Sequence, residues 1–197
     1  MRTEPAYVAD MPGTLMTADE LFRSSFPDQR VELVRGRLIV REPPGYVHGA
    51  VTARLASALL IHAAANDLGE VLAGDAGFTL FRNPDTVRGP DVAFIEKSRV
   101  PAPAPQAFAE FPPDLAVEVL SPRDGSREMR SKVADWLGAG TRLVWVIDPA
   151  RHEATIYRQG GTVASLNYDG ALRGEDVLPG FTCPLKALFS LGSTPRG

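Results

Sequence analysis

Apolar residues recur along this chain with two different periods. A long helix is predicted over 48–66, where Val51, Leu55 and Leu59 fall at helical spacing and alanine fills many of the other positions. Because residues three or four apart share one face of a helix, this spacing gives the segment a single buried stripe. A second helix is predicted over 126–138 on the same grounds.

Segments with strand character flank and separate these helices. A hairpin is expected around Gly36, because glycine supplies the positive φ that tight turns need. The expected strands are 31–34, 37–40, 69–81, 91–95, 115–120, 143–147, 154–157, 163–168 and a short piece near Val177. The strand–helix–strand order over 115–147 predicts two parallel neighbours in one sheet. The short strands that follow predict an antiparallel flank.

One domain accounts for most of the chain. A length of 197 residues fits a single domain of ordinary size. We expect this domain over 15–190, between an N-terminal arm (1–14) and a C-terminal tail (191–197). Its first helix is predicted to start at Thr17, where Thr17 and Glu20 have the spacing of a capping box.

Composition narrows the class of protein. Apolar residues make up 44% and charged residues 23% of the chain, which is typical of a globular domain. The balance of 21 Lys and Arg against 24 Asp and Glu gives a net charge of −3, which argues against nonspecific attraction to nucleic-acid phosphates. The single cysteine, Cys183, excludes a disulfide framework. Without a signal-peptide core or a run of about 18 apolar residues, a cytoplasmic protein with no membrane partner is expected.

Familiar catalytic motifs are missing, and two carboxylates stand out instead. The sequence contains no GxxxxGK[ST], GxGxxG or GxSxG pattern, which removes the main support for nucleotide binding and serine hydrolysis. Glu118 interrupts an apolar strand, and Asp91 follows Pro90 at the start of another. An unpaired ionised carboxylate in a core costs several kcal/mol, so Glu118 should be paired, protonated or bound to a metal.

The two carboxylates indicate metal-dependent chemistry. Carboxylates on neighbouring strands can hold one hard divalent cation and leave positions for water and a phosphate oxygen. Lys132, on the helix predicted after Glu118, lies at the border of the buried face. A lysine there can orient an attacking water and neutralise charge that develops on a phosphate. The pattern is typical of a phosphodiester hydrolase site.

Several short motifs, taken in order, resemble one family. They are Val31-Glu32-Leu33-Val34-Arg35-Gly36-Arg37-Leu38, His48 at the opening of a helix, Gly89-Pro90-Asp91-Val92, Val117-Glu118-Val119-Leu120-Ser121-Pro122, Lys132 and Trp145-Val146-Ile147-Asp148-Pro149. Together they resemble the Uma-type restriction endonuclease family of the PD-(D/E)XK nuclease superfamily, over about residues 15–190. The resemblance implies an α/β, restriction-endonuclease-like fold with a central mixed β-sheet flanked by helices.

The resemblance also implies roles for individual residues. Asp91 and Glu118 would hold a divalent metal, Mg²⁺ or Mn²⁺, and Glu32 would complete the metal shell or hold its water. The superfamily places a lysine two residues after the glutamate, where this chain has a leucine, and Lys132 would replace it from the following helix. His48 matches a recurrent family position and would contact phosphate or support the metal shell. The family further implies a homodimer.

Roles without chemistry stay open for each of these residues. Glu118 can form a structural ion pair, and Asp91 can cap the start of a strand. Glu32 lies between apolar neighbours, as a solvent-facing strand residue does, and Lys132 can be a solvated helix residue. Arg82 and Arg88, near the strand that begins at Asp91, can contact a phosphate, although loop arginines are usually solvated.

Three functional hypotheses follow. The first is a Mg²⁺-dependent endonuclease that hydrolyses DNA phosphodiester bonds by in-line attack, with DNA as its partner. The second is a noncatalytic nuclease-like module that binds nucleic acid or a protein partner. The third is a metal hydrolase that acts on small phosphoesters.

Overall fold

The computed structural model of the protein describes residues 15–26, 29–122 and 124–190. The predicted arm, 1–14, and tail, 191–197, lie outside these ranges. The elements in chain order are α1 (Ala18–Arg23), β1 (Arg30–Val34), β2 (Arg37–Arg41), α2 (Tyr46–Ala65), β3 (Gly69–Ala73), β4 (Phe78–Phe81), β5 (Thr86–Arg88), β6 (Val92–Glu96), the 3-10 helix η1 (Lys97–Arg99), β7 (Leu115–Val119), α3 (Ser126–Ala139), β8 (Leu143–Asp148), β9 (Glu153–Arg158), β10 (Val163–Leu166), β11 (Ala171–Arg173), β12 (Thr182–Pro184) and α4 (Leu185–Phe189).

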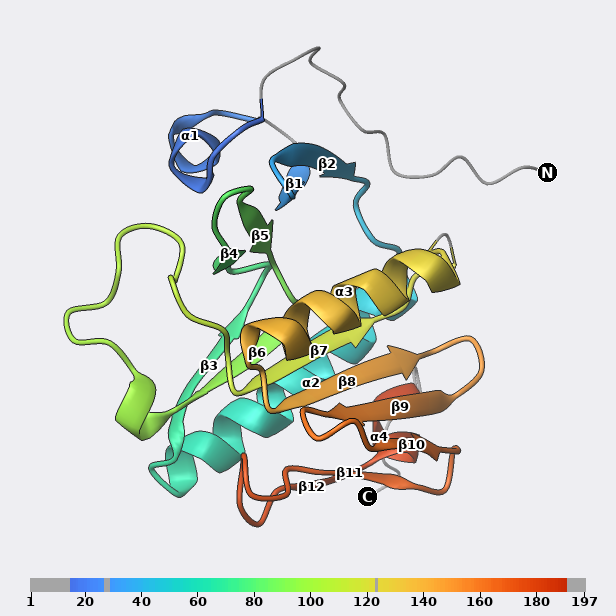
Figure 1. Ribbon diagram of the computed structural model, residues 1–197. Helices are drawn as coiled ribbons and strands as arrows, with labels where there is room; N and C mark the ends of the chain where they lie inside the picture. The colour runs from blue at the N-terminus through green and yellow to red at the C-terminus, as the bar shows by residue number, and fades with distance from the viewer. Residues whose placement is uncertain (1–14, 27–28, 123, 191–197) are drawn as a thin grey trace.

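A six-stranded mixed sheet forms the centre of the molecule (Figure 1). Its strand order is β10-β9-β8-β7-β6-β3. β7 and β8 are parallel and are connected through α3, which confirms the predicted crossover unit. The other neighbours are antiparallel, and β9 and β10 form the expected antiparallel flank. The predicted fold class, a mixed α/β fold with helices around a central sheet, is therefore confirmed.

Helices α2 and α3 cover opposite faces of this sheet. Successive residues of a strand point to opposite faces, so β7 divides its side chains between two cores. Val117 and Val119 belong to the core under α2 and α4, whereas Ala116 belongs to the core under α3. Glu118 follows the same alternation and reaches Lys132 of α3. The alternation of β7 thus determines which helix meets the buried carboxylate.

A second sheet of four strands packs beside the first, with the order β2-β1-β5-β4. Figure 1 shows this sheet and α1 above α3. The prediction of one strand over 69–81 was wrong, because β3 belongs to the central sheet and β4 to the smaller one. Positive φ angles at Gly74 (81°) and Asp75 (62°) turn the chain between the two strands. The hairpin was predicted correctly, and Gly36 has the expected positive φ of 75°.

The last part of the domain differs from its prediction in one element. The strand expected near Val177 is absent from the described residues of that stretch. β11 instead pairs with β12 on either side of a turn in which the Val177 N–H donates to the Gly174 carbonyl. Val177 is buried in the core under α2. Its apolar side chain therefore reflects core packing rather than strand structure.

α2 is the one described helix long and apolar enough to cross a membrane, by length and composition alone. Its predicted stripe of Val51, Leu55 and Leu59 is fully buried in the core of the central sheet. α2 therefore packs on the central sheet through one face, while Leu60 and Ile61 are exposed. At its N-terminal end the same stripe continues to His48, which is also buried and which lies beside the candidate site.

Candidate active site

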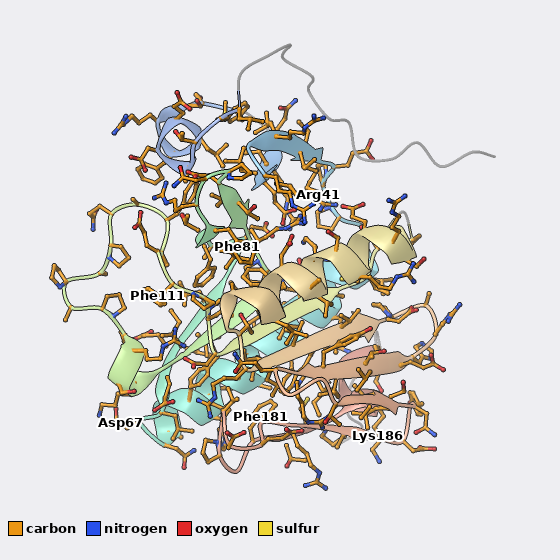
Figure 2. All side chains as sticks on the ribbon, in the orientation of Figure 1. Arg41, Asp67, Phe81, Phe111, Phe181 and Lys186 are labelled. Carbon is orange, nitrogen blue, oxygen red and sulfur yellow. The ribbon has the colours of Figure 1, made fainter. Side chains whose placement is uncertain are left out.

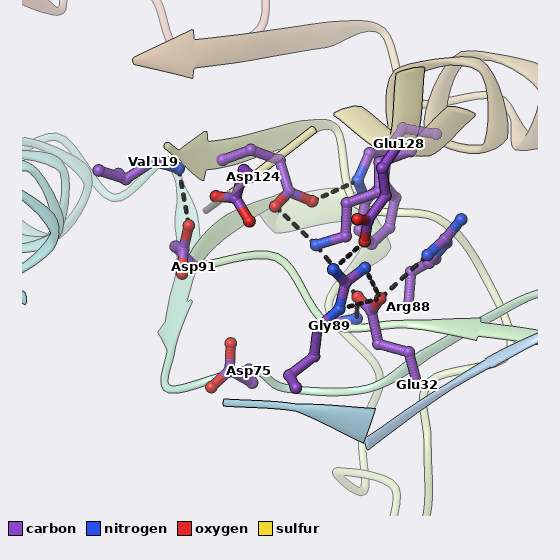
Figure 3. A network of polar contacts seen from close by, with 12 residues as sticks. Glu32, Asp75, Arg88, Gly89, Asp91, Val119, Asp124 and Glu128 are labelled. Carbon is purple, nitrogen blue, oxygen red and sulfur yellow. Dashed lines mark hydrogen bonds and ion pairs between the residues drawn. The ribbon is translucent and has the colours of Figure 1, made fainter. Parts of the chain in front are cut away.

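The predicted site residues come from five elements and meet where the small sheet, the central sheet and α3 adjoin. They are Glu32 on β1, His48 on α2, Asp91 directly before β6, Glu118 on β7 and Lys132 on α3. All five side chains are buried. Figure 3 shows the network of polar contacts that joins this region, with Glu32 and Asp91 on opposite sides of it.

Glu118 is the most enclosed of the carboxylates. All five residues of β7 are buried, so its side chain has no route to bulk water along the strand. The indole Nε1–H of Trp136 donates to Oε1 at 2.9 Å, and Lys132 Nζ donates to Oε2 at 2.8 Å. Glu118 is therefore paired, one of the three states that burial of a carboxylate allows.

Lys132 lies on the buried face of α3, as the helical spacing predicts. Its Nζ lies 3.1 Å from Glu32 Oε1 as well as 2.8 Å from Glu118 Oε2. Burial alone would lower the pKa of Lys132, but the charges of Glu118 and Glu32 outweigh it and raise the pKa above its ordinary value. The ammonium therefore stays charged between the two carboxylates, and the interpretation of Lys132 as a solvated helix residue was wrong.

Glu32 is surrounded by cations. Its Oε2 accepts hydrogen bonds from Arg41 Nη2 at 2.8 Å and from Arg88 Nη1 at 2.9 Å, while Oε1 faces Lys132. Burial alone would raise the pKa of Glu32, but the charges of Lys132, Arg88 and Arg41 hold it well below its ordinary value. The solvent-facing interpretation of Glu32 was wrong, because Arg41, Arg88 and Lys132 of α3 cover its carboxylate.

Sequence reasoning missed Arg41, and it considered Arg88 only as a phosphate contact or a solvated loop residue. Arg88 is buried on β5 and joins Glu32 to Asp135 of α3, with Nη2 2.6 Å from Asp135 Oδ2. Arg41, at the end of β2, joins Glu32 to Glu128 of α3. Figure 2 shows Arg41 between the small sheet and α3. Arg41 follows the continuous apolar run 38–40 of β2, which gave no sign of a buried partner, and the burial of Arg88 was not foreseen because β5 was not predicted.

Asp91 approaches the site from the other side. The register pairs Val92 with Val117, so Asp91 lies across from Glu118 on the adjacent strand. Its Oδ2 accepts the Val119 N–H at 2.7 Å. Burial would raise the pKa of Asp91, but the hydrogen bond and charge of His48 and the Val119 N–H hold it below its ordinary value. Asp91 therefore stays ionised beside Glu118.

His48 and Arg30 complete the surroundings of Asp91. His48 Nε2 lies 3.2 Å from Asp91 Oδ1, and its Nδ1 is buried without a hydrogen-bond partner among the described residues. Arg30 Nη2 lies 3.5 Å from the same Oδ1 and also contacts Asp75. His48 thus supports Asp91, one of the predicted metal-binding carboxylates.

The neighbouring acidic groups raise the proton affinity of Glu118. Burial raises the pKa of Glu118, and although Lys132 opposes this, the neighbouring charges of Asp91 and Glu32 add to it, so the pKa lies above its ordinary value. A carboxylate in this state is stabilised in its ionised form by any further cation nearby. The site thus favours positive charge beyond what Lys132 supplies.

The donor atoms fit a magnesium-type ion better than a structural zinc site. Within the part of the chain that the structure describes, no group of three or more His, Cys, Asp or Glu side chains is gathered to hold a metal. Asp91 and Glu118 offer two carboxylates from adjacent strands. Mg²⁺ is commonly bound by one or two carboxylates with water completing its shell. Glu32, by contrast, already accepts from three cationic side chains.

Comparison with known proteins places the chain in a family. The family model Uma2, described as "Putative restriction endonuclease", matches residues 18–186. The chain belongs to this family. A crystal structure of a protein from Anabaena variabilis, described as a putative nuclease belonging to DUF820, matches with a TM-score of 0.79 and 21% identity, over 89% of this chain and 98% of that one. At this identity the likeness shows the fold alone. The search of curated proteins returned no match.

This Uma2-family chain carries its predicted site residues on the elements expected for them. Glu118 and Lys132 are in direct contact, Glu32 joins them through Lys132, and His48 contacts Asp91. The structure thus forms two linked groups. One is a charge network around Glu32, and the other is the pair of carboxylates at the ends of β6 and β7.

Proposed function

We propose that the protein is a Mg²⁺-dependent endonuclease that hydrolyses DNA phosphodiester bonds. The observation that carries the proposal is the placement of two ionisable carboxylates, Asp91 and Glu118, on adjacent strands with the Lys132 ammonium 2.8 Å from Glu118. Family membership and the nuclease-like fold support it. The resemblance of the sequence motifs to the PD-(D/E)XK superfamily supports the choice of DNA as the substrate.

In this proposal Asp91 and Glu118 hold the metal, Mg²⁺ or Mn²⁺. When bound, the ion supplies a Lewis acid for a phosphate oxygen and lowers the pKa of a bound water. The Val119 N–H and His48 hold Asp91 in place, and the Trp136 indole holds Glu118.

Lys132 and Glu32 act beside the metal. The Lys132 ammonium donates to the attacking water or to the phosphate oxygen on which charge develops. Glu32 keeps Lys132 charged and directed at this point, since its contacts with Arg41 and Arg88 occupy its other oxygen. Two roles were implied for Glu32, a place in the metal shell or holding the metal-bound water. These contacts favour the second role.

A plasmid assay tests the proposal. Supercoiled plasmid has no ends, so its conversion to nicked or linear form reports endonuclease activity. We expect conversion with Mg²⁺ or Mn²⁺, none with EDTA, and none for Asp91→Asn or Glu118→Gln. The exposed carboxylates Asp67 and Glu110 provide the matched controls Asp67→Asn and Glu110→Gln, which should cut as the wild type does. Equal activity in EDTA, or in both site variants, would contradict the proposal.

The noncatalytic module is the second candidate, and one observation favours it. Each acidic group of the site is already satisfied by a cation or an N–H of the chain itself. A protein of this class would bind DNA and Mg²⁺ without cutting plasmid, single-stranded or branched substrates. Hydrolysis of a chromogenic phosphodiester without DNA cleavage would instead indicate an enzyme that acts on small phosphoesters.

A further inference from the structure

The cations around the site differ in what they contact. Lys132, Arg88 and Arg41 each contact Glu32 and one further carboxylate, so all three belong to one network. Arg30 lies outside this network, because it has no ion pair with Glu32 among the described contacts. It begins β1, two residues before Glu32, and its Nη2 contacts Asp75 and lies 3.5 Å from Asp91 Oδ1.

The cations also differ in their access to solvent. The side-chain exposures are 3% for Arg88, 10% for Lys132, 17% for Arg41 and 33% for Arg30. A substrate phosphate arrives from solvent, so the first three are poorly placed to meet it. Arg30 is the most exposed of the four, and it contacts a carboxylate that we propose as a metal ligand.

The guanidinium of Arg30 has donors to spare. Both of its contacts with described carboxylates are made by Nη2. Its Nε is buried and has no hydrogen-bond partner among the described residues. Since a guanidinium carries five N–H donors in a planar fork that matches a phosphate, a residue held through one nitrogen keeps most of its capacity for an anion.

A divalent cation at Asp91 would change the partners of Arg30. The metal would compete with the Arg30 guanidinium for Asp91 Oδ1, which His48 Nε2 also contacts. Bound metal repels Arg30 from this oxygen and leaves Asp75 as its contact among the described residues. An anion that approaches the metal from solvent then meets a guanidinium close by, with unused donors.

We propose that Arg30 is the phosphate-binding residue of this site, which leaves Asp91 when the metal binds and takes a non-bridging oxygen of the DNA phosphodiester. The inference rests on the proposed function for the identity of the phosphate. Arg30 would then have two effects. In the metal-free protein it competes with the metal for Asp91, and in the metal-bound protein it attracts the DNA phosphate.

Two binding measurements on full-length protein test this assignment. The first is calorimetric titration of Mn²⁺ without DNA. The second is fluorescence anisotropy of a labelled 20-base-pair duplex in Ca²⁺, repeated over a range of salt concentrations. The variants are Arg30→Gln, which removes the charge, and Arg30→Lys, which keeps it. Arg173→Gln, on the distant strand β11, serves as the control.

Arg30→Gln should weaken duplex binding without weakening Mn²⁺ binding. We expect Mn²⁺ to bind at least as tightly as in the wild type and the duplex to bind about 10-fold more weakly, as for one lost charge-assisted contact. The slope of log K against log salt should fall by about 0.9, the value for one phosphate contact. Arg30→Lys should restore the salt slope, and Arg173→Gln should change neither quantity.

Other outcomes overturn the assignment in recognisable ways. A structural role for Arg30 would weaken metal and duplex binding together in both Arg30 variants. Unchanged duplex affinity and salt slope in Arg30→Gln would show that Arg30 does not meet the phosphate, and so would a wild type that binds no duplex. If the wild type binds metal and duplex but cuts no plasmid, the proposed function fails while the role of Arg30 in binding is still decided by its variants.

Discussion

Lys132 Nζ and Glu118 Oε2 lie 2.8 Å apart, both buried, one on a helix and the other on a strand of the central sheet. Glu32 shares the same ammonium from the smaller sheet, at 3.1 Å. Burying an ion pair costs desolvation energy, so such a pair is weak grounds for stability alone. The position of the Lys132–Glu118 pair beside Asp91 is better explained by a role in metal-dependent cleavage. Variants of these residues test that role.

Lys132→Met should lower the cleavage rate more than it lowers metal affinity. Loss of a positioned proton donor and charge typically costs on the order of 10²- to 10⁴-fold in rate. Mn²⁺ affinity should be equal or higher, because a cation that contacts Glu118 is removed. Plasmid cleavage rates and calorimetric titration measure the two effects.

The exposed Lys97, paired with Asp67 at the surface, gives the matched control Lys97→Met. This variant should cut and bind metal as the wild type does. The role assigned to Lys132 is wrong if Lys132→Met remains folded by circular dichroism and cuts plasmid at the wild-type rate.

Glu32 should make stability depend on pH. Its pKa is lower in the folded protein than in the unfolded chain, so its charge stabilises the fold fully above the ordinary glutamate pKa. This contribution declines as the pH falls below that value towards the lowered folded pKa. Urea unfolding of wild type and Glu32→Gln should differ by about 3 kcal/mol or more at pH 7, and by less at pH 3. An equal difference at both pH values would contradict the charge network.

Arg88 should matter more to stability than an exposed arginine does. Arg88→Met leaves Glu32 and Asp135 without their shared partner, and breaking a buried pair costs about 3–5 kcal/mol. Arg151→Met, which removes an exposed side chain 3.8 Å from Asp148, should cost about 1 kcal/mol or less. Urea unfolding compares the two variants. Similar decreases in the free energy of unfolding would show that the buried contacts of Arg88 do not stabilise the fold more than a surface pair does.

The two tryptophans isolate the hydrogen bond to Glu118. Both are fully buried, but only Trp136 uses its Nε1–H, since Trp145 Nε1 is buried without a partner among the described residues. Trp136→Phe should therefore cost about 1.5–3 kcal/mol more than Trp145→Phe, the usual range for a hydrogen bond to a charged group. Equal losses in urea unfolding would mean that the indole does not hold Glu118.

The sequence predicted the central sheet well because its signals are local. The periodic apolar residues of α2, the five-residue apolar strand β7 and the crossover through α3 each leave a pattern within a short window. Glu118 was identifiable for the same reason, since one acidic residue in such a strand has few explanations. Lys132 was predictable from helix geometry, which gives its face but not its partner.

The parts that the sequence did not predict depend on contacts between distant segments. β5 has three residues, too few for a recognisable period, and it is buried by pairing with β1 and β4. Arg88 therefore looked like a loop residue. Glu32 looked exposed because alternation cannot show that three cations from other elements cover its side chain.

Titration of the purified protein with Mg²⁺ tests the central claim most directly, because it asks whether Asp91 and Glu118 hold a divalent cation before any substrate is considered. We predict one site in the wild type and in Asp67→Asn, and at least a 10-fold weaker site in Asp91→Asn and in Glu118→Gln, all four folded by circular dichroism. A wild type that binds no Mg²⁺, or two site variants that bind it with wild-type affinity, would contradict the claim.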